Sequence, residues 1–246
     1  MMVVRCFRIV RIAGLALATV ALAASPALAA DDDAGSAPAA QAPKMISLAP
    51  PSGSGPVVVV VSGDTGTGNY EYFASDVARL GYSTVLVDGK DVYGRGIEGG
   101  AVLRRIIAEA LAAPTARPGK VVVIGFSLGG GASLVYATAM QRSVAGVIVF
   151  YPLTRVPVTP QRLAERMRVP VLMFAGGADH YHDCCLIETA HAIEAAASEA
   201  KAPFELVVYP DADHGFSIHG RGYRAADMTD AWKRTRDRLA QLSPLS

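Results

Sequence analysis

Apolar residues cluster along the chain in short runs, and segments with helical spacing follow them. The runs are rich in Val and Ile and are hardly interrupted by polar residues, which is typical of strands buried on both faces of a sheet. The predicted strands are 57–62, 83–87, 120–126, 147–151, 170–175 and 204–209. The predicted helices are 70–80, 101–113, 128–141, 160–167, 184–199 and 228–242.

Strands and helices alternate in this prediction, and the alternation indicates an α/β fold. Alternating elements favour parallel strands joined by right-handed crossovers, which produce a doubly wound, mostly parallel sheet. In such a sheet the ligand crevice lies at the carboxyl ends of the strands. We therefore expect functional residues directly after the predicted strands.

The N-terminus has the pattern of a secretory signal peptide. Three arginines precede an apolar run over 12–24, and small residues follow as far as Ala30. The run is shorter than the roughly 20 residues that a membrane span needs. The pattern predicts cleavage after Ala29 and an exported protein, periplasmic or secreted, without a stable membrane span. The alternative is an uncleaved N-terminal anchor.

Residues 30–54 are expected to form a disordered leader into a single domain over 55–246. The leader is rich in Ala, Pro, Gly and Ser, with too few large apolar side chains to pack. Cleavage after Ala29 removes three arginines and no acidic residue, which changes the formal net charge from +1 to −2. Nucleic-acid binding is therefore disfavoured. The 51% of hydrophobic residues are enough for one full core.

The strongest chemical motif is the sequence Gly-Phe-Ser-Leu-Gly at 125–129, between a predicted strand and a predicted helix. A GxSxG motif at such a junction is typical of a sharp turn that lifts a serine nucleophile above the sheet, and its glycines avoid steric clashes. Ser127 is therefore the candidate nucleophile. The alternative is a glycine-rich turn whose serine has no chemical role.

A serine nucleophile needs a general base and an acid that orients the base, and candidates for both follow later strands. Asp179 lies just beyond 170–175, and His214 lies just beyond 204–209. The order Ser, Asp, His is that of α/β-hydrolases. Asp179 could instead cap a turn, and His214 could be a surface residue. The other histidines are expected at the surface or at the rim of the site.

Acyl transfer also needs N–H donors that point at the developing oxyanion. The backbone N–H of Leu128 directly follows the candidate nucleophile, and the glycine-rich loop over 62–68 follows the first predicted strand. We expect the N–H of Leu128 and that of Asp64 to form this oxyanion hole, with Thr65 as the alternative second donor. Thr65, Tyr151 and Tyr181 are expected to bind substrate as walls of the pocket. A phosphate-binding loop at 62–68 is a weaker alternative, because the loop lacks GxGxxG and a GK[ST] ending.

The segment 180–185, with the sequence His-Tyr-His-Asp-Cys-Cys, contains several potential zinc ligands. No compact four-ligand spacing is evident, so no metal site is predicted. A disulfide between Cys184 and Cys185 is possible in an oxidising compartment, but adjacent Cα atoms lie about 3.8 Å apart, below the usual range for disulfides. We expect two reduced cysteines packed at the start of a helix.

Taken together, the segments 125–129, 177–179 and 209–216 resemble the α/β-hydrolase superfamily, and specifically its dienelactone-hydrolase-like branch. The sequence Ala-Trp-Lys-Arg-Thr at 231–235 is similar to a helix of that branch. The resemblance covers roughly 57–242. One departure is that the namesake enzymes have a cysteine nucleophile, whereas position 127 is serine.

The resemblance implies an α/β-hydrolase fold and a Ser127, Asp179 and His214 triad that hydrolyses a small-molecule ester or lactone without a cofactor. The connection over 152–159 is too short for a large lid domain. A carboxylic ester is expected as substrate rather than dienelactone itself, because of the serine. Alternatives are a serine peptidase or lipid-acting hydrolase with the same triad, or a non-catalytic binding protein with this fold.

Overall fold

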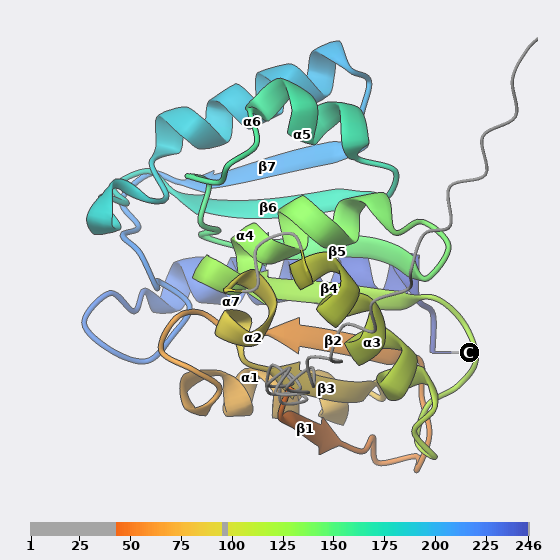
Figure 1. The fold of residues 1–246 in the computed structure, drawn as a ribbon. Helices are drawn as coiled ribbons and strands as arrows, with labels where there is room; N and C mark the ends of the chain where they lie inside the picture. Colours follow the sequence, from red (N-terminus) through yellow and green to blue (C-terminus); the bar gives the residue numbers. More distant parts are fainter. Residues whose placement is uncertain (1–42, 95–97, 246) are drawn as a thin grey trace, which may run out of the picture. The chain divides into compact units, whose positions relative to one another are not determined.

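The computed structural model of the chain describes residues 43–94 and 98–245. The predicted signal peptide, and the predicted leader as far as residue 42, lie outside the described residues. The described part contains a seven-stranded sheet in the order β1-β3-β2-β4-β5-β6-β7, flanked by helices (Figure 1). The strands are β1 (Met45–Leu48), β2 (Val57–Val61), β3 (Ser83–Val87), β4 (Val121–Phe126), β5 (Val144–Phe150), β6 (Val171–Gly176) and β7 (Phe204–Tyr209).

Strands β2 to β7 pair in parallel, and only β1 runs antiparallel, to its neighbour β3. The predicted doubly wound, mostly parallel fold class is therefore confirmed. The α-helices are α1 (Glu71–Arg79), α2 (Gly89–Tyr93), α3 (Gly99–Leu111), α4 (Ser127–Tyr136), α5 (Pro160–Arg166), α6 (Ile187–Glu199) and α7 (Ala225–Leu242). The short 3₁₀ helices are η1 (Gly68–Tyr70), η3 (Ala137–Ala139) and η4 (Tyr181–Asp183).

Helices cover the sheet on both faces, as the uninterrupted apolar strands require. Successive side chains of a strand point to opposite faces, and β2 is buried throughout. Val57, Val59 and Val61 belong to a core with residues of α2 to α6. Val58 and Val60 belong to a second core with residues of α1 and α7. Both layers exclude water from the central strands β2, β3, β4 and β6, which support the loops at the carboxyl edge of the sheet.

Two elements were not expected from the sequence. Strand β1 lies inside the segment 30–54 that we expected to be a disordered leader, and it pairs along β3. That expectation is wrong for Met45–Leu48. Four residues are too few to show a clear strand pattern in the sequence, but they are enough to cover the open edge of a sheet. Helix α2 is a five-residue element capped by Asp88, whose side chain accepts a hydrogen bond from the Lys90 N–H.

Among the described residues, no helix is both long enough and apolar enough to cross a membrane.

Candidate active site

The site begins at the junction between β4 and α4, where the chain turns sharply at Ser127. The strand ends at Phe126 with extended backbone, and the helix begins at Ser127, whose φ is 48°. A left-handed conformation costs a residue with a side chain on the order of 1–3 kcal/mol, so it persists only where neighbouring contacts hold it. Ser127 is 6% exposed. The turn therefore presents the hydroxyl at the carboxyl edge of the sheet.

The turn requires glycine on either side of Ser127, because the surroundings leave no room for a Cβ atom at these two positions. A Cβ at Gly125 would lie 2.6 Å from the carbonyl oxygen of Gly129. A Cβ at Gly129 would lie 2.3 Å from the carbonyl oxygen of Ser62. The Gly129 N–H donates a hydrogen bond to that same Ser62 oxygen at 3.1 Å. The motif thus ties α4 to the end of β2.

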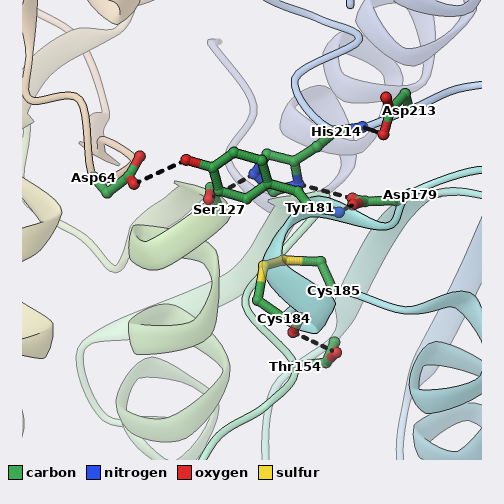
Figure 2. The surroundings of a disulfide bond; sticks show 9 residues. All are labelled: Asp64, Ser127, Thr154, Asp179, Tyr181, Cys184, Cys185, Asp213 and His214. Atoms are coloured by element: carbon green, nitrogen blue, oxygen red, sulfur yellow. Dashed lines mark hydrogen bonds and ion pairs between the residues drawn. A yellow bond between two sulfur atoms is a disulfide. The ribbon is translucent and has the colours of Figure 1, made fainter.

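The structure brings the three predicted triad side chains into one continuous chain of hydrogen bonds (Figure 2). Ser127 Oγ lies 2.9 Å from His214 Nε2, and His214 Nδ1 lies 2.7 Å from Asp179 Oδ2. An ionised carboxylate only accepts hydrogen bonds, so Nδ1 carries a hydrogen toward Asp179. In the neutral imidazole, Nε2 then accepts the Ser127 hydroxyl hydrogen. This tautomer is the one that can remove a proton from serine.

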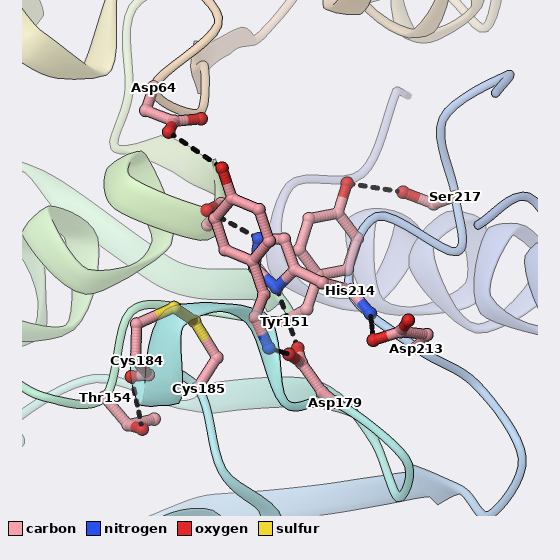
Figure 3. Close-up of polar contacts among 11 residues, drawn as sticks. Asp64, Tyr151, Thr154, Asp179, Cys184, Cys185, Asp213, His214 and Ser217 are labelled. Carbon is pink, nitrogen blue, oxygen red and sulfur yellow. Dashed lines mark hydrogen bonds and ion pairs between the residues drawn. A yellow bond between two sulfur atoms is a disulfide. The ribbon is translucent and has the colours of Figure 1, made fainter. Parts of the chain in front are cut away.

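Two tyrosines hold the imidazole of His214 between them. The ring of Tyr181 stacks on it with centroids 4.5 Å apart and an interplanar angle of 7°. The ring of Tyr151 meets it at 67° with centroids 4.9 Å apart. Tyr151 is only 1% exposed, and its hydroxyl lies 3.0 Å from Ser217 Oγ (Figure 3). Tyr151 therefore packs behind the imidazole, not along an open pocket wall as we expected.

Tyr181 lies across the site and contacts residues on both sides of it. Its backbone N–H donates to Asp179 Oδ1 at 3.1 Å, and its hydroxyl donates to Asp64 Oδ2 at 3.4 Å. The nearby Asp64 carboxylate raises the pKa of the Tyr181 hydroxyl, so the hydroxyl remains a donor at neutral pH. The side chain thus links the loop after β6 to the loop after β2, above the hydroxyl of Ser127 (Figure 2).

The loop over 62–68, which contains the other predicted site residues, lies against Ser127. A Cβ at Gly63 would lie 3.3 Å from the Ser127 Cβ and 2.3 Å from the Tyr70 hydroxyl oxygen. Burial raises the pKa of Tyr70 to about 12, although hydrogen bonds with Thr65 and the Gly63 backbone oppose the shift. A neutral phenol therefore contacts this loop at Gly63 and Thr65. Thr65 is exposed, and its hydroxyl accepts a hydrogen bond from Asn69 Nδ2 at 3.2 Å.

The structure corrects the expectation for the cysteines, because Cys184 and Cys185 form a disulfide. The helix expected from Cys184 begins only at Ile187. Before it, His182 and Asp183 have φ angles of 50° and 52°, so the chain turns back on itself instead of continuing into a helix. The usual Cα separation of disulfides describes cysteines on distant segments, and it does not prevent two adjacent side chains from turning toward each other.

The remaining predicted residues are placed as follows. The four other histidines, His180, His182, His191 and His219, are exposed, as expected. Leu128 is in the first turn of α4, where backbone N–H groups have no carbonyl partner within the helix. A cleft of about 650 Å³ opens beside Tyr181 and His214. Another cavity, of about 640 Å³, contacts Arg104 and Tyr136 and contains no residue of the predicted triad.

A family model for the "Dienelactone hydrolase family" matches residues 46–243, which is most of the chain. The chain belongs to this family. A curated relative from Escherichia coli O157:H7, described as "Putative carboxymethylenebutenolidase", is 32% identical over 121 residues. That match covers 47% of this chain and 44% of the relative, so the chain spans less than half the length of the curated relative it matches.

Solved structures show the same fold at low sequence identity. The "Putative Dienelactone Hydrolase" of Klebsiella pneumoniae has a TM-score of 0.68 and 20% identity, covering 82% of this chain and 100% of that one. Esterase 2 of Thermogutta terrifontis, solved after phosphonylation by sarin, has a TM-score of 0.63 and 19% identity. That match covers 83% of this chain and 91% of the esterase.

Sequence reasoning missed two features around His214: the stacking of Tyr181 on the imidazole and the neighbouring disulfide. The cysteine pair follows the candidate acid by only a few residues, in a chain whose first residues predict export. Export favours disulfides, so this combination was the available signal for the disulfide. The sequence contains no comparable signal for the stacking of Tyr181 on His214, because this contact depends on the path of the loop after β6.

Replacing Gly129 by alanine should destabilise the fold. The new Cβ would press against the Ser62 and Val61 carbonyl oxygens, and overpacking of this kind typically costs about 1–3 kcal/mol. We expect the urea midpoint of unfolding, followed by circular dichroism, to fall accordingly. Gly68→Ala is the matched control, because nothing lies within 4 Å of a Cβ at Gly68. Equal midpoints for the two variants would contradict the packing argument.

Proposed function

We propose that this protein is a serine hydrolase that cleaves carboxylic esters or lactones through an acyl-enzyme intermediate. The observation that carries the proposal is the chain of hydrogen bonds from Ser127 Oγ through His214 to the buried carboxylate of Asp179. A serine hydroxyl is a weak nucleophile until an adjacent base takes its proton. Family membership supports a hydrolase, and the serine at position 127 supports ester chemistry beyond dienelactone.

In the proposed mechanism, His214 Nε2 removes the Ser127 proton as Oγ attacks the substrate carbonyl. Asp179 accepts a hydrogen bond from the Nδ1–H. It thereby holds the ring in the required tautomer and stabilises the imidazolium that forms. His214 then protonates the leaving alcohol, and the acyl group stays on Ser127. Water, activated by the same imidazole, releases the acid. No metal or organic cofactor takes part in these steps.

The oxyanion needs preorganised donors near Ser127. The N–H of Leu128 suits this role because it belongs to the first turn of α4, whose positive dipole end also favours developing negative charge. The second donor that we propose is the N–H of Asp64. The close contact between Gly63 and the Ser127 side chain supports a donor from this loop.

Replacement of Ser127 by alanine should abolish ester hydrolysis. Removal of the nucleophile from a triad costs several orders of magnitude, and we expect kcat to fall at least about 10⁴-fold. The assay is a panel of short-chain esters, long-chain esters, lactones and peptides, with fluorophosphonate labelling of the native protein. The matched control is Ser52→Ala, at an exposed turn.

Each result of this panel separates the proposal from an alternative. Preference for peptides or for long acyl chains would favour a peptidase or a lipid-acting hydrolase. A native protein that neither turns over esters nor takes the fluorophosphonate label would favour a non-catalytic binding protein. Unchanged turnover in the Ser127→Ala variant would reject the mechanism.

Tyr181 is proposed to limit the size of the acyl group, because it connects the loops on either side of Ser127. Tyr181→Ala should raise the kcat/KM for a bulky acyl ester relative to an acetyl ester by about tenfold, since small changes in a pocket have effects of this size. Tyr181→Phe keeps the ring and loses only the hydroxyl. We expect its ratio to stay within about twofold of the native ratio. If the ratio of kcat/KM for the bulky and acetyl esters is unchanged in both variants, Tyr181 does not limit the size of the acyl group.

We also propose that the protein is exported and that residues 1–29 are removed. The basic, apolar and small-residue segments support this, and a disulfide suits an oxidising compartment. N-terminal sequencing of the protein recovered from the exported fraction should then start at Ala30. An intact Met1 on a membrane-associated protein would instead indicate an uncleaved anchor.

A further inference from the structure

The cysteine pair lies directly against the imidazole of the proposed triad. The sulfur atoms of Cys184 and Cys185 and a ring nitrogen of His214 all lie within 4.8 Å of one another (Figure 2). Cys185 is 4% exposed, whereas Cys184 is partly exposed. Thiolate sulfur and neutral imidazole nitrogen are the ligands preferred by zinc and similar soft cations. The donor set for such a cation is therefore already assembled beside Ser127.

His214 has the orientation of a metal-binding histidine. Metal-bound histidines commonly donate the second ring N–H to a carboxylate, which fixes the tautomer. The Nδ1 of His214 lies 2.7 Å from Asp179 Oδ2, so the lone pair of the neutral ring is on Nε2. The partner of Nε2 is the Ser127 hydroxyl at 2.9 Å. A cation bound to Nε2 would displace that hydrogen bond.

The disulfide bond must open before the sulfurs can act as thiolate ligands. A dithiol reductant attacks one sulfur, the S–S bond breaks, and a second exchange releases the reductant as its own disulfide. Two electrons pass to the cysteine pair, and each sulfur gains a proton. Binding of a divalent cation to both thiolates then releases those two protons. Cys184, which is partly exposed, is the accessible point of attack.

The distances suit such a site after a small rearrangement. Zn–S bonds of about 2.3 Å and Zn–N bonds of about 2.0–2.1 Å in a tetrahedron place neighbouring ligand atoms about 3.5–3.8 Å apart. The two sulfurs and one ring nitrogen of His214 already lie within 4.8 Å of one another, and the sulfurs separate once their bond is broken. The Cys184 carbonyl, held by the N–H groups of Thr154 and Arg155, keeps the pair near His214 in the reduced protein.

We propose that, in the reduced protein, Cys184, Cys185 and His214 form a binding site for a thiophilic divalent cation such as Zn²⁺, and that occupation of this site blocks hydrolysis. The cation takes the Nε2 lone pair that would otherwise accept the Ser127 proton, so the base is lost. The inhibition rests on the proposed function, whereas the binding of the cation does not. The disulfide of the oxidised protein keeps the site closed to metal.

The decisive experiment titrates Cd²⁺, as a spectroscopic substitute for Zn²⁺, into the full chain after reduction and anaerobic removal of the reductant. We expect a thiolate-to-cadmium charge-transfer band that saturates at one equivalent per chain and is displaced by Zn²⁺. The oxidised protein should lack the band. A Cys184→Ser/Cys185→Ser variant should lack it too. This variant still contains Cys6, the third cysteine of the sequence, so it controls for any band from that residue. His191→Ala, at an exposed histidine of α6, should bind as the native protein does.

Variants of His214 and Asp179 test whether the imidazole is a ligand. His214→Ala should weaken Zn²⁺ binding, and Asp179→Asn should weaken it by about 10- to 100-fold, as loss of a histidine's carboxylate partner does elsewhere. Undiminished Zn²⁺ affinity in the His214→Ala variant would overturn the site, as would a cadmium band of equal strength in the double cysteine variant. These readouts need no enzymatic activity.

The inhibition is tested separately with the reduced, chelator-treated enzyme as reference. One equivalent of Zn²⁺ should remove at least about nine-tenths of ester turnover, because the cation and the serine proton compete for one lone pair. The oxidised enzyme should keep its activity when Zn²⁺ is added. The double cysteine variant, compared with its own rate without the cation, should show no loss of turnover on addition of Zn²⁺. A reduced protein that binds the cation and hydrolyses esters at an unchanged rate would overturn the inhibition. A native protein inactive on every ester would refute only the proposed function.

Discussion

The hydrogen bond between Asp179 and His214 is the interaction on which the rest of the site depends. The Asp179 side chain is 1% exposed, and a buried charge is costly unless it is paired. One carboxylate oxygen accepts a hydrogen bond from the Nδ1–H of His214, and the other accepts a hydrogen bond from the backbone N–H of Tyr181. Loss of a partner from a buried pair typically costs about 3–5 kcal/mol. The same carboxylate therefore orients the imidazole and holds the loop that covers it.

Backbone contacts perform the equivalent task for Ser127. The Leu153 N–H donates to the Ser127 carbonyl oxygen at 2.8 Å, and the Gly129 N–H donates to the Ser62 carbonyl oxygen. These bonds connect the turn to the segments that follow β2 and β5, and they hold the left-handed conformation at Ser127. Strands β4 and β6, which lead to Ser127 and Asp179, are buried along their whole length and provide packed support for both residues.

Much of the fold was predictable, because strands buried on both faces leave a strong pattern in the sequence. All six predicted strands are present, most of them within a residue of their predicted bounds. Strand β1 was missed because its stability comes from pairing with β3 and not from its own composition. The triad positions followed from a motif and from the rule that parallel strands end at one edge. The roles of these residues in catalysis remain a proposal.

The sequence by itself determined the mostly parallel fold class and the positions of Ser127, Asp179 and His214 directly after their strands. Fold class and positions both depend on patterns within short segments. The tertiary structure alone decided that Tyr151 packs behind the imidazole, that Tyr181 stacks in front of it, and that the cysteine pair lies against it. These contacts join segments far apart in the chain. They depend on the paths of loops, such as the left-handed turn at His182 and Asp183, and local sequence patterns carry no record of such paths.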